Sequence, residues 1–211
     1  MVRAASAIEA RKKIASKIPL WHTHPELLYP NSLSVEQCSS QATAEYKMRF
    51  VPEGGTIADL TGGLGVDCSF MARRAAKCLY VDRDTQLCEA AAHNFKVLGL
   101  ENISIKQGDC REYLDVVTGA SKELSGVNEE FSDTIGWLLK ANEDLSKEHE
   151  ALTKADVERE THFDLIYLDP ARRSKTSSRV FSIRECEPDL FQFGNVLLKV
   201  ADRVLVKLSP M

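Results

Sequence analysis

The stretch from Ile57 to Asp67 reads IADLTGGLGVD, and it constrains the fold more than any other part of the chain. A short apolar run with an acidic residue passes into a glycine-rich turn, and a helical pattern follows over residues 66–76. Residues 79–82 predict a second strand that ends in the carboxylate of Asp82. Glycines let the backbone turn tightly and approach a ligand, and a helix start offers free N–H groups. We therefore predict a nucleotide-type cofactor site, in which Asp82 accepts hydrogen bonds from both hydroxyls of a ribose.

Two common phosphate-binding patterns do not fit this turn. The dinucleotide fingerprint G-x-G-x-x-G can begin at Gly63 and Gly65, but Cys68 then stands where the third glycine belongs. That glycine allows helix and strand to pack closely beneath a pyrophosphate, so NAD and FAD are disfavoured. No Gly-Lys-Ser/Thr follows the glycines, which argues against a P-loop.

The same residues resemble motif I of the class I S-adenosylmethionine (SAM)-dependent methyltransferases. That motif has an acidic residue followed by glycines at alternate positions. Asp59, Gly63 and Gly65 match it, with Thr61 in place of the first glycine. The resemblance implies that SAM is the cofactor and that these four residues bind it. SAM has no phosphate, so the loop has to fit only an amino-acid tail and a ribose.

Three later segments follow in the order of that family. Residues 103–109 read as a third strand, residues 163–169 as a fourth strand that leads into motif IV, and residues 203–208 as a fifth. The resemblance places an acidic residue after the third strand against the adenine amine. The further cofactor residues that it implies are Asp82, Arg83, Asp109 and Cys110, and the catalytic residues are Asp169, Pro170 and Arg172.

The turns and carboxylates also have simpler structural explanations, which the sequence leaves open. The glycine turn can be only a tight connection between strand and helix. Asp82 can be the N-cap of a helix expected from Thr85, and Asp109 can cap a turn. The order of four motifs over residues 37–210 favours the cofactor site.

Apolar runs alternate with helical patterns, which predicts an α/β fold of the Rossmann-like class I methyltransferase type. We expect its parallel sheet to have helices on both faces. A helical N-terminal extension is expected over residues 1–50, with a basic helix over 5–17, and the SAM-binding domain over 51–211. The charged residues 118–162 predict a solvated helical insertion or, alternatively, a substrate lid or partner-docking element.

On this reading the sheet is truncated after its fifth strand, whereas the family's sheet has seven strands. An uncovered strand edge favours association with another chain, so we expect a piece of a longer protein or self-association. The chain resembles the N-terminal part of bacterial methyltransferases that carry a THUMP-like C-terminal domain. Residues 38–44 resemble the segment that lies over the SAM site in trimethylguanosine synthase-like RNA methyltransferases.

Composition narrows the class of protein. No apolar run approaches the length of a membrane span, and the N-terminus lacks the apolar region of a signal peptide, so a cytoplasmic protein is expected. The six cysteines form no Cys-x-x-Cys pair, which predicts reduced structural thiols. His22 and His24 lack a completing carboxylate–histidine pattern, so no metal site is expected.

Basic residues gather in two clusters, although the net charge is −4. The first is Arg3, Arg11, Lys12, Lys13 and Lys17, and the second, after motif IV, is Arg172, Arg173, Lys175, Arg179 and Arg184. Positive charge beside the site favours RNA as the acceptor of the methyl group. Ala171 and Arg172 depart from the Asp/Asn-Pro-Pro-aromatic pattern of amino-methylating relatives. Arg172 can instead bind a phosphate or stack on a base.

Methyl transfer from SAM to RNA is therefore the leading hypothesis, with a protein or a small molecule as alternative acceptors. A non-catalytic SAM- or RNA-binding module and a nucleotide-dependent oxidoreductase stay open. Covalent pyrimidine methylation is disfavoured, because the turn at Ser209 and Pro210 after the fifth strand has no cysteine. Cys186 is expected to be a structural thiol.

Overall fold

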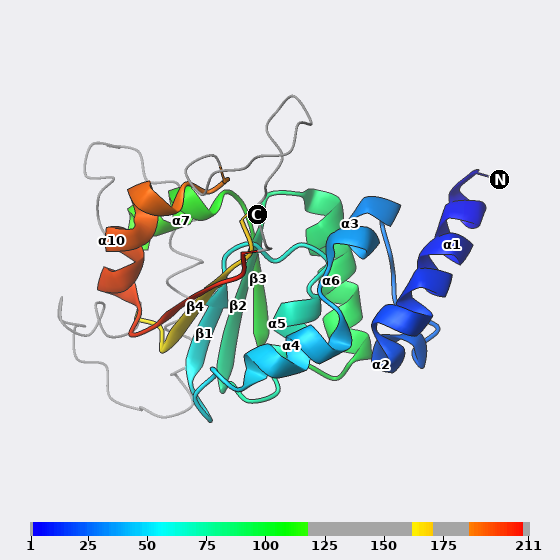
Figure 1. Ribbon diagram of the computed structural model, residues 1–211, viewed down its shortest axis with the longest axis horizontal. Coiled ribbons are helices and arrows are strands. Elements are labelled where there is room, and N and C mark those ends of the chain that lie inside the picture. The colour runs from blue at the N-terminus through cyan, green and yellow to red at the C-terminus, as the bar shows by residue number, and fades with distance from the viewer. Residues whose placement is uncertain (1, 118–161, 171–185, 209–211) are drawn as a thin grey trace, which may run out of the picture.

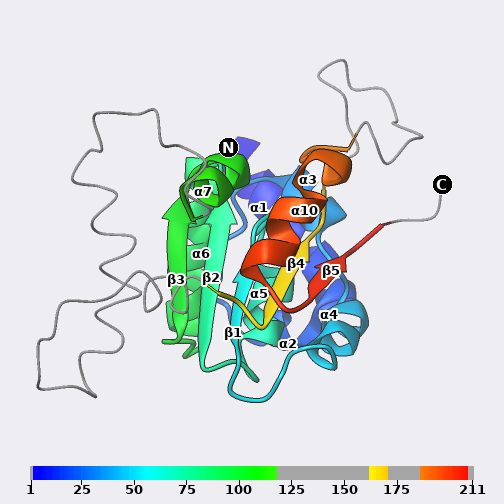
Figure 2. The ribbon, with the colours of Figure 1, turned by 90° about the vertical axis from the view of Figure 1, so that its left-hand side faces the viewer.

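The computed structural model describes residues 2–117, 162–170 and 186–208 of the chain. These residues form one sheet of five parallel strands in the order β3-β2-β1-β4-β5 (Figure 2). The strands are β1 (Thr56–Asp59), β2 (Lys77–Asp82), β3 (Ile103–Gln107), β4 (Leu165–Leu168) and β5 (Val204–Val206). Each strand overlaps the run predicted for it, and the α/β fold with a parallel sheet is confirmed.

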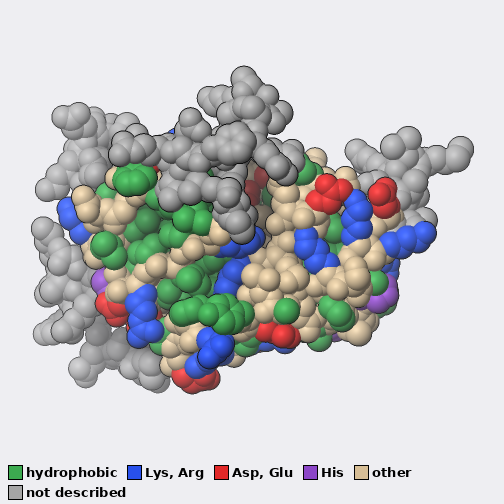
Figure 3. Space-filling model, in the orientation of Figure 1, with side chains coloured by type: hydrophobic (Ala, Val, Ile, Leu, Met, Phe, Trp, Pro, Cys, Tyr) green, Lys and Arg blue, Asp and Glu red, His purple; other side chains and the backbone are tan. Residues whose placement is uncertain are grey.

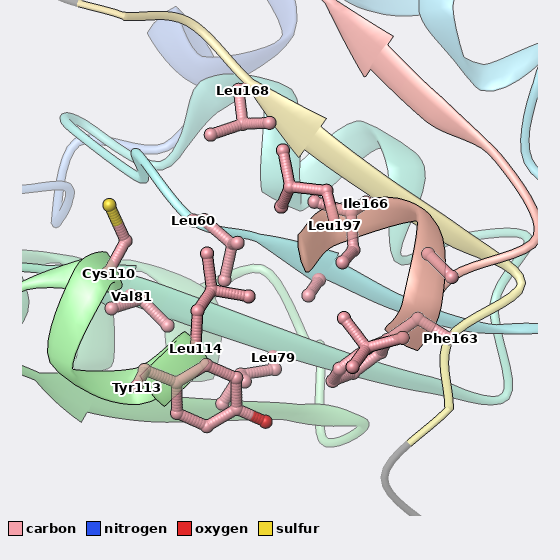
Figure 4. Packing of buried hydrophobic residues seen from close by; sticks show 13 residues of the cluster. Leu60, Leu79, Val81, Cys110, Tyr113, Leu114, Phe163, Ile166, Leu168 and Leu197 are labelled. Atoms are coloured by element: carbon pink, nitrogen blue, oxygen red, sulfur yellow. The ribbon is translucent and has the colours of Figure 1, made fainter. Parts of the chain in front are cut away.

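Helices cover both faces of this sheet (Figure 1). One face carries α5 (Val66–Met71) and α6 (Thr85–Val97), and the other carries α7 (Cys110–Val117) and α10 (Leu190–Val200). Because side chains alternate along a strand, neighbouring residues serve different cores. Ile166 packs toward α7 and α10 (Figure 4), whereas Tyr167 packs toward α5 and α6. Both faces are therefore buried, as expected for a parallel sheet.

Four helices precede the sheet and form a further layer outside α5 and α6 (Figure 1). They are α1 (Val2–Lys17), α2 (Pro19–His22), α3 (Ser32–Gln37) and α4 (Gln41–Met48). Pro19 opens α2 at its first position, where a missing N–H costs nothing. Ser40 is the N-cap of α4, and its side chain accepts the Thr43 N–H. The buried Trp21 shares a core with Phe70 of α5, so this layer packs directly on the helix that follows the glycine-rich turn.

Two local predictions need correction. The helix predicted over residues 66–76 ends at Met71, and beyond its C-cap Ala72 the N–H groups of Arg73 and Arg74 bond to carbonyls only three residues back. The N-cap of α6 is Asp84, whose carboxylate accepts the N–H groups of Gln86 and Leu87. The alternative that made Asp82 this cap is therefore wrong.

The topology places a crevice at one end of the sheet. From β1 the chain runs outward through β2 to β3 and then returns to β4 on the other side of β1. The connections leaving β1 and β4 therefore diverge at the carboxyl ends of these strands. Ligands of open α/β sheets bind outside such a switch point, so we expect a ligand site at the turns that follow the strands.

The β5 end of the sheet presents an apolar surface. Within the described residues, β5 pairs only with β4, and its other edge has no partner strand. Hydrophobic side chains gather over this side, between α10 and α4 (Figure 3). The exposed large ones on the flanking elements are Tyr46, Phe50, Phe191, Leu198 and Leu208. Association through this edge stays a prediction.

Several sequence predictions concern residues outside the described part. They are the helical insertion, almost all of which falls at 118–161, the catalytic role of Arg172, and the second basic cluster, which lies within 172–184. In the described part, no helix combines the length and the apolar character that crossing a membrane requires.

Candidate functional site

A pocket of about 400 Å³ lies at the carboxyl ends of the strands. Its walls come from the turns after β1, β2, β3 and β4 and from α3, which contributes Ser34 and Gln37. Small-molecule sites commonly have volumes of about 300–1,000 Å³. The predicted site residues that line it are Thr61, Gly63, Asp82, Arg83, Asp109, Cys110 and Asp169. Four separate motifs therefore meet around one cavity, as their order in the chain indicated.

The turn after β1 follows the floor of this pocket. Gly63 has a φ of +55° and Gly65 a φ of +82°, a left-handed conformation that side chains rarely adopt. The Gly63 N–H donates to the Asp82 carboxylate at 2.7 Å, which ties the turn to the end of β2. Gly65 does not line the pocket. A Cβ at this position would lie 2.8 Å from the ring of Phe95, so Gly65 is needed for packing against α6.

Gly62 is a residue of this turn whose role the sequence did not reveal. A Cβ on Gly62 would lie 2.1 Å from the ring of Tyr80, and the Tyr80 hydroxyl donates to the Gly63 carbonyl at 2.6 Å. The partner lies on the neighbouring strand, so only the sheet register exposes this requirement. Cys68, at the position of the third fingerprint glycine, is also packed against β2, with its sulfur 3.3 Å from that of Cys78.

Asp82 holds the turn together and still has room for a ligand. One carboxylate oxygen accepts the Gly63 N–H, and the other accepts the Asp84 N–H at 2.8 Å. Each oxygen of a carboxylate can accept a further hydrogen bond. The Asp82 carboxylate lines the pocket with both oxygens positioned by the backbone, so it can accept the two hydroxyls of a ribose.

Asp59 is the predicted motif I carboxylate, but it lies beneath the pocket and does not line it. Its side chain is buried, and one oxygen accepts the Thr61 N–H at 3.1 Å. The other oxygen has no hydrogen-bond partner among the described residues. Burial, with a contribution from the charge of Asp67, raises the pKa of Asp59 well above its usual range. Asp59 therefore shapes the backbone at Thr61 from below.

A buried polar cluster next to Asp59 joins the N-terminal layer to the sheet. The Lys47 ammonium on α4 lies 2.7 Å from the Asp67 carboxylate on α5, and 2.8 Å from both the Tyr167 hydroxyl and the Ser39 hydroxyl. Tyr167 and Ser39 also donate to Asp67. Burial lowers the pKa of Lys47, and the Asp67 carboxylate opposes this shift. The sequence did not predict this cluster, because only the fold brings these segments together.

Asp109 and its neighbours form the wall of the pocket beyond β3. The Asp109 carboxylate accepts the backbone N–H of Arg111 at 2.9 Å and pairs with the Arg111 guanidinium, whose hydrogen bond lowers the pKa of Asp109. The turn-capping alternative is therefore the observed one, and a contact with adenine stays a prediction. Arg83 pairs with Glu187 at 3.0 Å, so its guanidinium contacts a segment that the sequence did not connect with the site. Cys110 is buried, which raises its pKa to about 11.

Asp169 stands at the carboxyl end of β4 and is fixed at two points. Its N–H donates to the Thr61 hydroxyl at 2.6 Å, and its carboxylate lies 2.5 Å from the Lys207 ammonium at the end of β5. Pro170 is buried directly after it. Lys207 was not among the predicted site residues, since only the adjacency of β4 and β5 brings it to Asp169.

The first basic cluster is largely occupied within the chain. Arg11 donates to the Pro25 carbonyl, Lys17 donates to the carbonyls of Val35 and Glu36, and Lys13 pairs with the Glu36 carboxylate at 2.5 Å. These side chains fasten α1 to the following segment. In the part of the chain that is described, no three His, Cys, Asp or Glu side chains gather as a metal site would require. All six cysteines are free thiols in the structure.

Similarity to one solved structure supports the fold. The chain is 32% identical to a candidate methyltransferase of Porphyromonas gingivalis W83, over 98% of this chain and 41% of that one, with a TM-score of 0.69. A candidate O-methyltransferase of Klebsiella pneumoniae is 12% identical, over 95% of this chain and 70% of that one, with a TM-score of 0.48. No protein-family model and no curated protein matches the chain. The chain spans less than half of the first structure, and that similarity confirms the predicted methyltransferase fold of the Rossmann-like type.

Proposed function

We propose that this chain is the SAM-binding part of a methyltransferase and that SAM occupies the pocket at the carboxyl ends of the strands. The observation that carries the proposal is the Asp82 carboxylate, which is held by the glycine turn and by the Asp84 N–H with acceptor positions left over. It suits a ribose, and the Gly63 turn suits a ligand without phosphate. The similarity to a methyltransferase-type structure over nearly the whole chain supports the same function.

Asp169 is the residue that we place beside the reacting atoms. It lines the pocket together with Thr61, at the end of β4 and across the crevice from the Asp82 side. SAM supplies an already activated methyl group, so positioning of the acceptor provides much of the catalysis. The Asp169 carboxylate can accept a hydrogen bond from the acceptor group, and the buried Pro170 restricts the backbone that carries it.

We further propose that the acceptor is an RNA. The support is the run of basic residues that follows Pro170 in the sequence, because cations beside the site would neutralise phosphates. The first basic cluster adds less support, since Lys13 and Lys17 already have partners within the chain. Arg172 is the first of the basic residues after Pro170, and we propose that it binds a phosphate or a base of the RNA.

Two further resemblances noted in the sequence belong to the same proposal. They are the likeness to bacterial methyltransferases with a THUMP-like domain and the likeness to trimethylguanosine synthase-like enzymes. The cofactor roles of Arg83, Asp109 and Cys110 and association through β5 have the same standing. A protein or a small molecule is the alternative acceptor.

Calorimetric titration tests the cofactor first. The chain is titrated with SAM, with its demethylated product S-adenosylhomocysteine, and with NADH as a control. Saturable binding of the two sulfur compounds and no binding of NADH is expected, whereas NADH binding without SAM binding would contradict the proposal. Methyl transfer from tritiated SAM is then measured on the RNA and protein fractions of a bacterial lysate. Label in RNA that falls steeply with rising salt supports an RNA acceptor, and label confined to protein contradicts it.

A further inference from the structure

The Asp169–Lys207 ion pair lies where the methyl group would be transferred. Parallel pairing aligns Leu168 of β4 with Val206 of β5, so Asp169 and Lys207 are the next residues on adjacent strands. The Lys207 N–H donates to the Leu168 carbonyl at 2.8 Å, which fixes the backbone that carries the lysine side chain. The two charged groups lie 2.5 Å apart. Their proximity thus follows from the register of the sheet.

The pair completes a clamp on Asp169. On the backbone side, the Asp169 N–H donates to the Thr61 hydroxyl, and Thr61 belongs to the glycine turn. On the side-chain side, Lys207 binds one carboxylate oxygen, Oδ2. Asp169 is therefore held between the turn after β1 and the end of β5. Among the described residues its other oxygen, Oδ1, accepts no hydrogen bond, so it can accept one from a ligand.

A purely stabilising role explains this pair poorly. The side chains of Asp169 and Lys207 are 33% and 24% exposed, and ion pairs that reach solvent contribute little to stability. The buried Lys47–Asp67 pair nearby already joins the N-terminal layer to the sheet. Partial exposure at the carboxyl end of β4 is instead what a group that meets a substrate requires.

We propose that Lys207 is a positioning residue for methyl transfer, which holds the Asp169 carboxylate in the orientation that receives the acceptor group. The inference rests on the proposed function. In the transfer, the acceptor atom forms a bond to the methyl carbon while the carbon–sulfur bond breaks, and its electron pair stays on sulfur. The acceptor's proton leaves to water, and Lys207 keeps its own protons. Lys207 acts only through Asp169.

The test compares Lys207→Met, which keeps the length but removes the charge, with Lys207→Arg, which keeps the charge. Lys199→Met, on the exposed face of α10, is the control. For Lys207→Met we expect an unchanged thermal midpoint, a SAM dissociation constant within about twofold of the wild type, and a transfer rate at saturating SAM and RNA reduced by about tenfold to a hundredfold. Lys207→Arg should restore most of the rate, and Lys199→Met should have none of these effects. A wild-type rate in Lys207→Met overturns the inference, as does a rate loss matched by an equal loss of SAM affinity.

A second measurement separates this inference from the proposed RNA acceptor. If the wild type binds SAM but labels no RNA, the RNA proposal is contradicted, and the same variants are compared on whichever lysate fraction accepts label. The pair is also tested without any acceptor, through the ¹⁵N signal of the Lys207 ammonium. That signal is expected to shift in Asp169→Asn and to stay in place in Asp202→Asn. An unchanged signal in Asp169→Asn overturns the inference.

Discussion

The ring of Tyr80 fills the space that a side chain at position 62 would need, since a Cβ on Gly62 would lie 2.1 Å from Tyr80 Cε2. The ring is buried, and its hydroxyl donates to the Gly63 carbonyl at 2.6 Å. It therefore cannot turn aside without losing that hydrogen bond. The Tyr80 ring of β2 thus packs beneath the glycine turn after β1 and requires glycine at position 62.

Gly62→Ala is expected to destabilise the chain and distort the pocket. Overpacking against the buried Tyr80 ring costs about 1–3 kcal/mol, and the displaced turn should also weaken SAM binding. Urea unfolding and calorimetry measure the two effects. Gly194→Ala is the matched control, because among the described residues nothing outside the backbone of the α10 helix and the residues adjoining Gly194 lies within 4 Å of its Cβ position. That change should stabilise by up to about 1 kcal/mol. Equal unfolding free energies for the two variants would show that Tyr80 does not constrain Gly62.

Asp82→Ala is expected to weaken SAM binding at least tenfold while the chain stays folded. The change removes the acceptor proposed for the ribose and releases the Gly63 N–H, and hydrogen bonds to a charged group are worth about 1.5–3 kcal/mol each. A tenfold change in affinity corresponds to about 1.4 kcal/mol. Calorimetric titration with SAM measures it, and Asp202→Ala, far from the pocket lining, serves as the control. An unaltered dissociation constant would remove Asp82 from the cofactor site.

The sequence predicted those parts of the molecule that depend on neighbouring residues. The apolar run before Thr61 and the glycines after it indicate the end of a strand, and this local pattern does not depend on distant parts of the chain. Local chemistry did not decide which acidic residue begins α6, since Asp82 and Asp84 lie in the same turn. The structure resolves it, because the Asp82 carboxylate accepts the Gly63 N–H, whereas the Asp84 carboxylate accepts the N–H groups of Gln86 and Leu87 at the start of the helix.

Features that join distant segments could not be predicted in this way. Lys207 meets Asp169 only because β5 lies next to β4, and the order of strands in a sheet is a tertiary property. Lys47 lies in the short helix α4 without any sequence motif, yet it is buried against Asp67. Lys17 is a further example, since the backbone carbonyls that it binds belong to Val35 and Glu36 of α3.

Lys47→Met is expected to destabilise the chain strongly. The ammonium and the Asp67 carboxylate are 7% and 10% exposed, so removing the lysine leaves a buried carboxylate without its counter-charge. Breaking such a pair costs about 3–5 kcal/mol, whereas replacing both partners costs less. The double variant Lys47→Met, Asp67→Asn should therefore regain part of the loss in urea unfolding. Strictly additive effects would show that the two groups are not coupled.

The protonation of Asp59 should make stability depend on pH. Burial raises the pKa of Asp59 well above its ordinary value of 3.8, so the folded chain holds a proton that the unfolded chain releases. The resulting stabilisation is complete below the ordinary value and is lost as the pH rises through the raised pKa of the folded state. The slope over that window approaches about 1.4 kcal/mol per pH unit for one proton.

Asp59→Asn isolates this contribution, because asparagine carries no proton to release and keeps an oxygen that can accept the Thr61 N–H. Urea unfolding between about pH 4 and pH 8 should give a flatter profile for this variant than for the wild type, with Asp202→Asn retaining the wild-type slope. The lowered pKa of Lys47 acts with the opposite sign, adding stability as the pH rises from its folded value toward the ordinary value of 10.5. Wild type and Asp59→Asn both carry Lys47, so the difference between their profiles reports Asp59. Parallel profiles for the wild type and Asp59→Asn would show that Asp59 is ionised in the folded chain, and the cofactor turn would then rest on a buried charge.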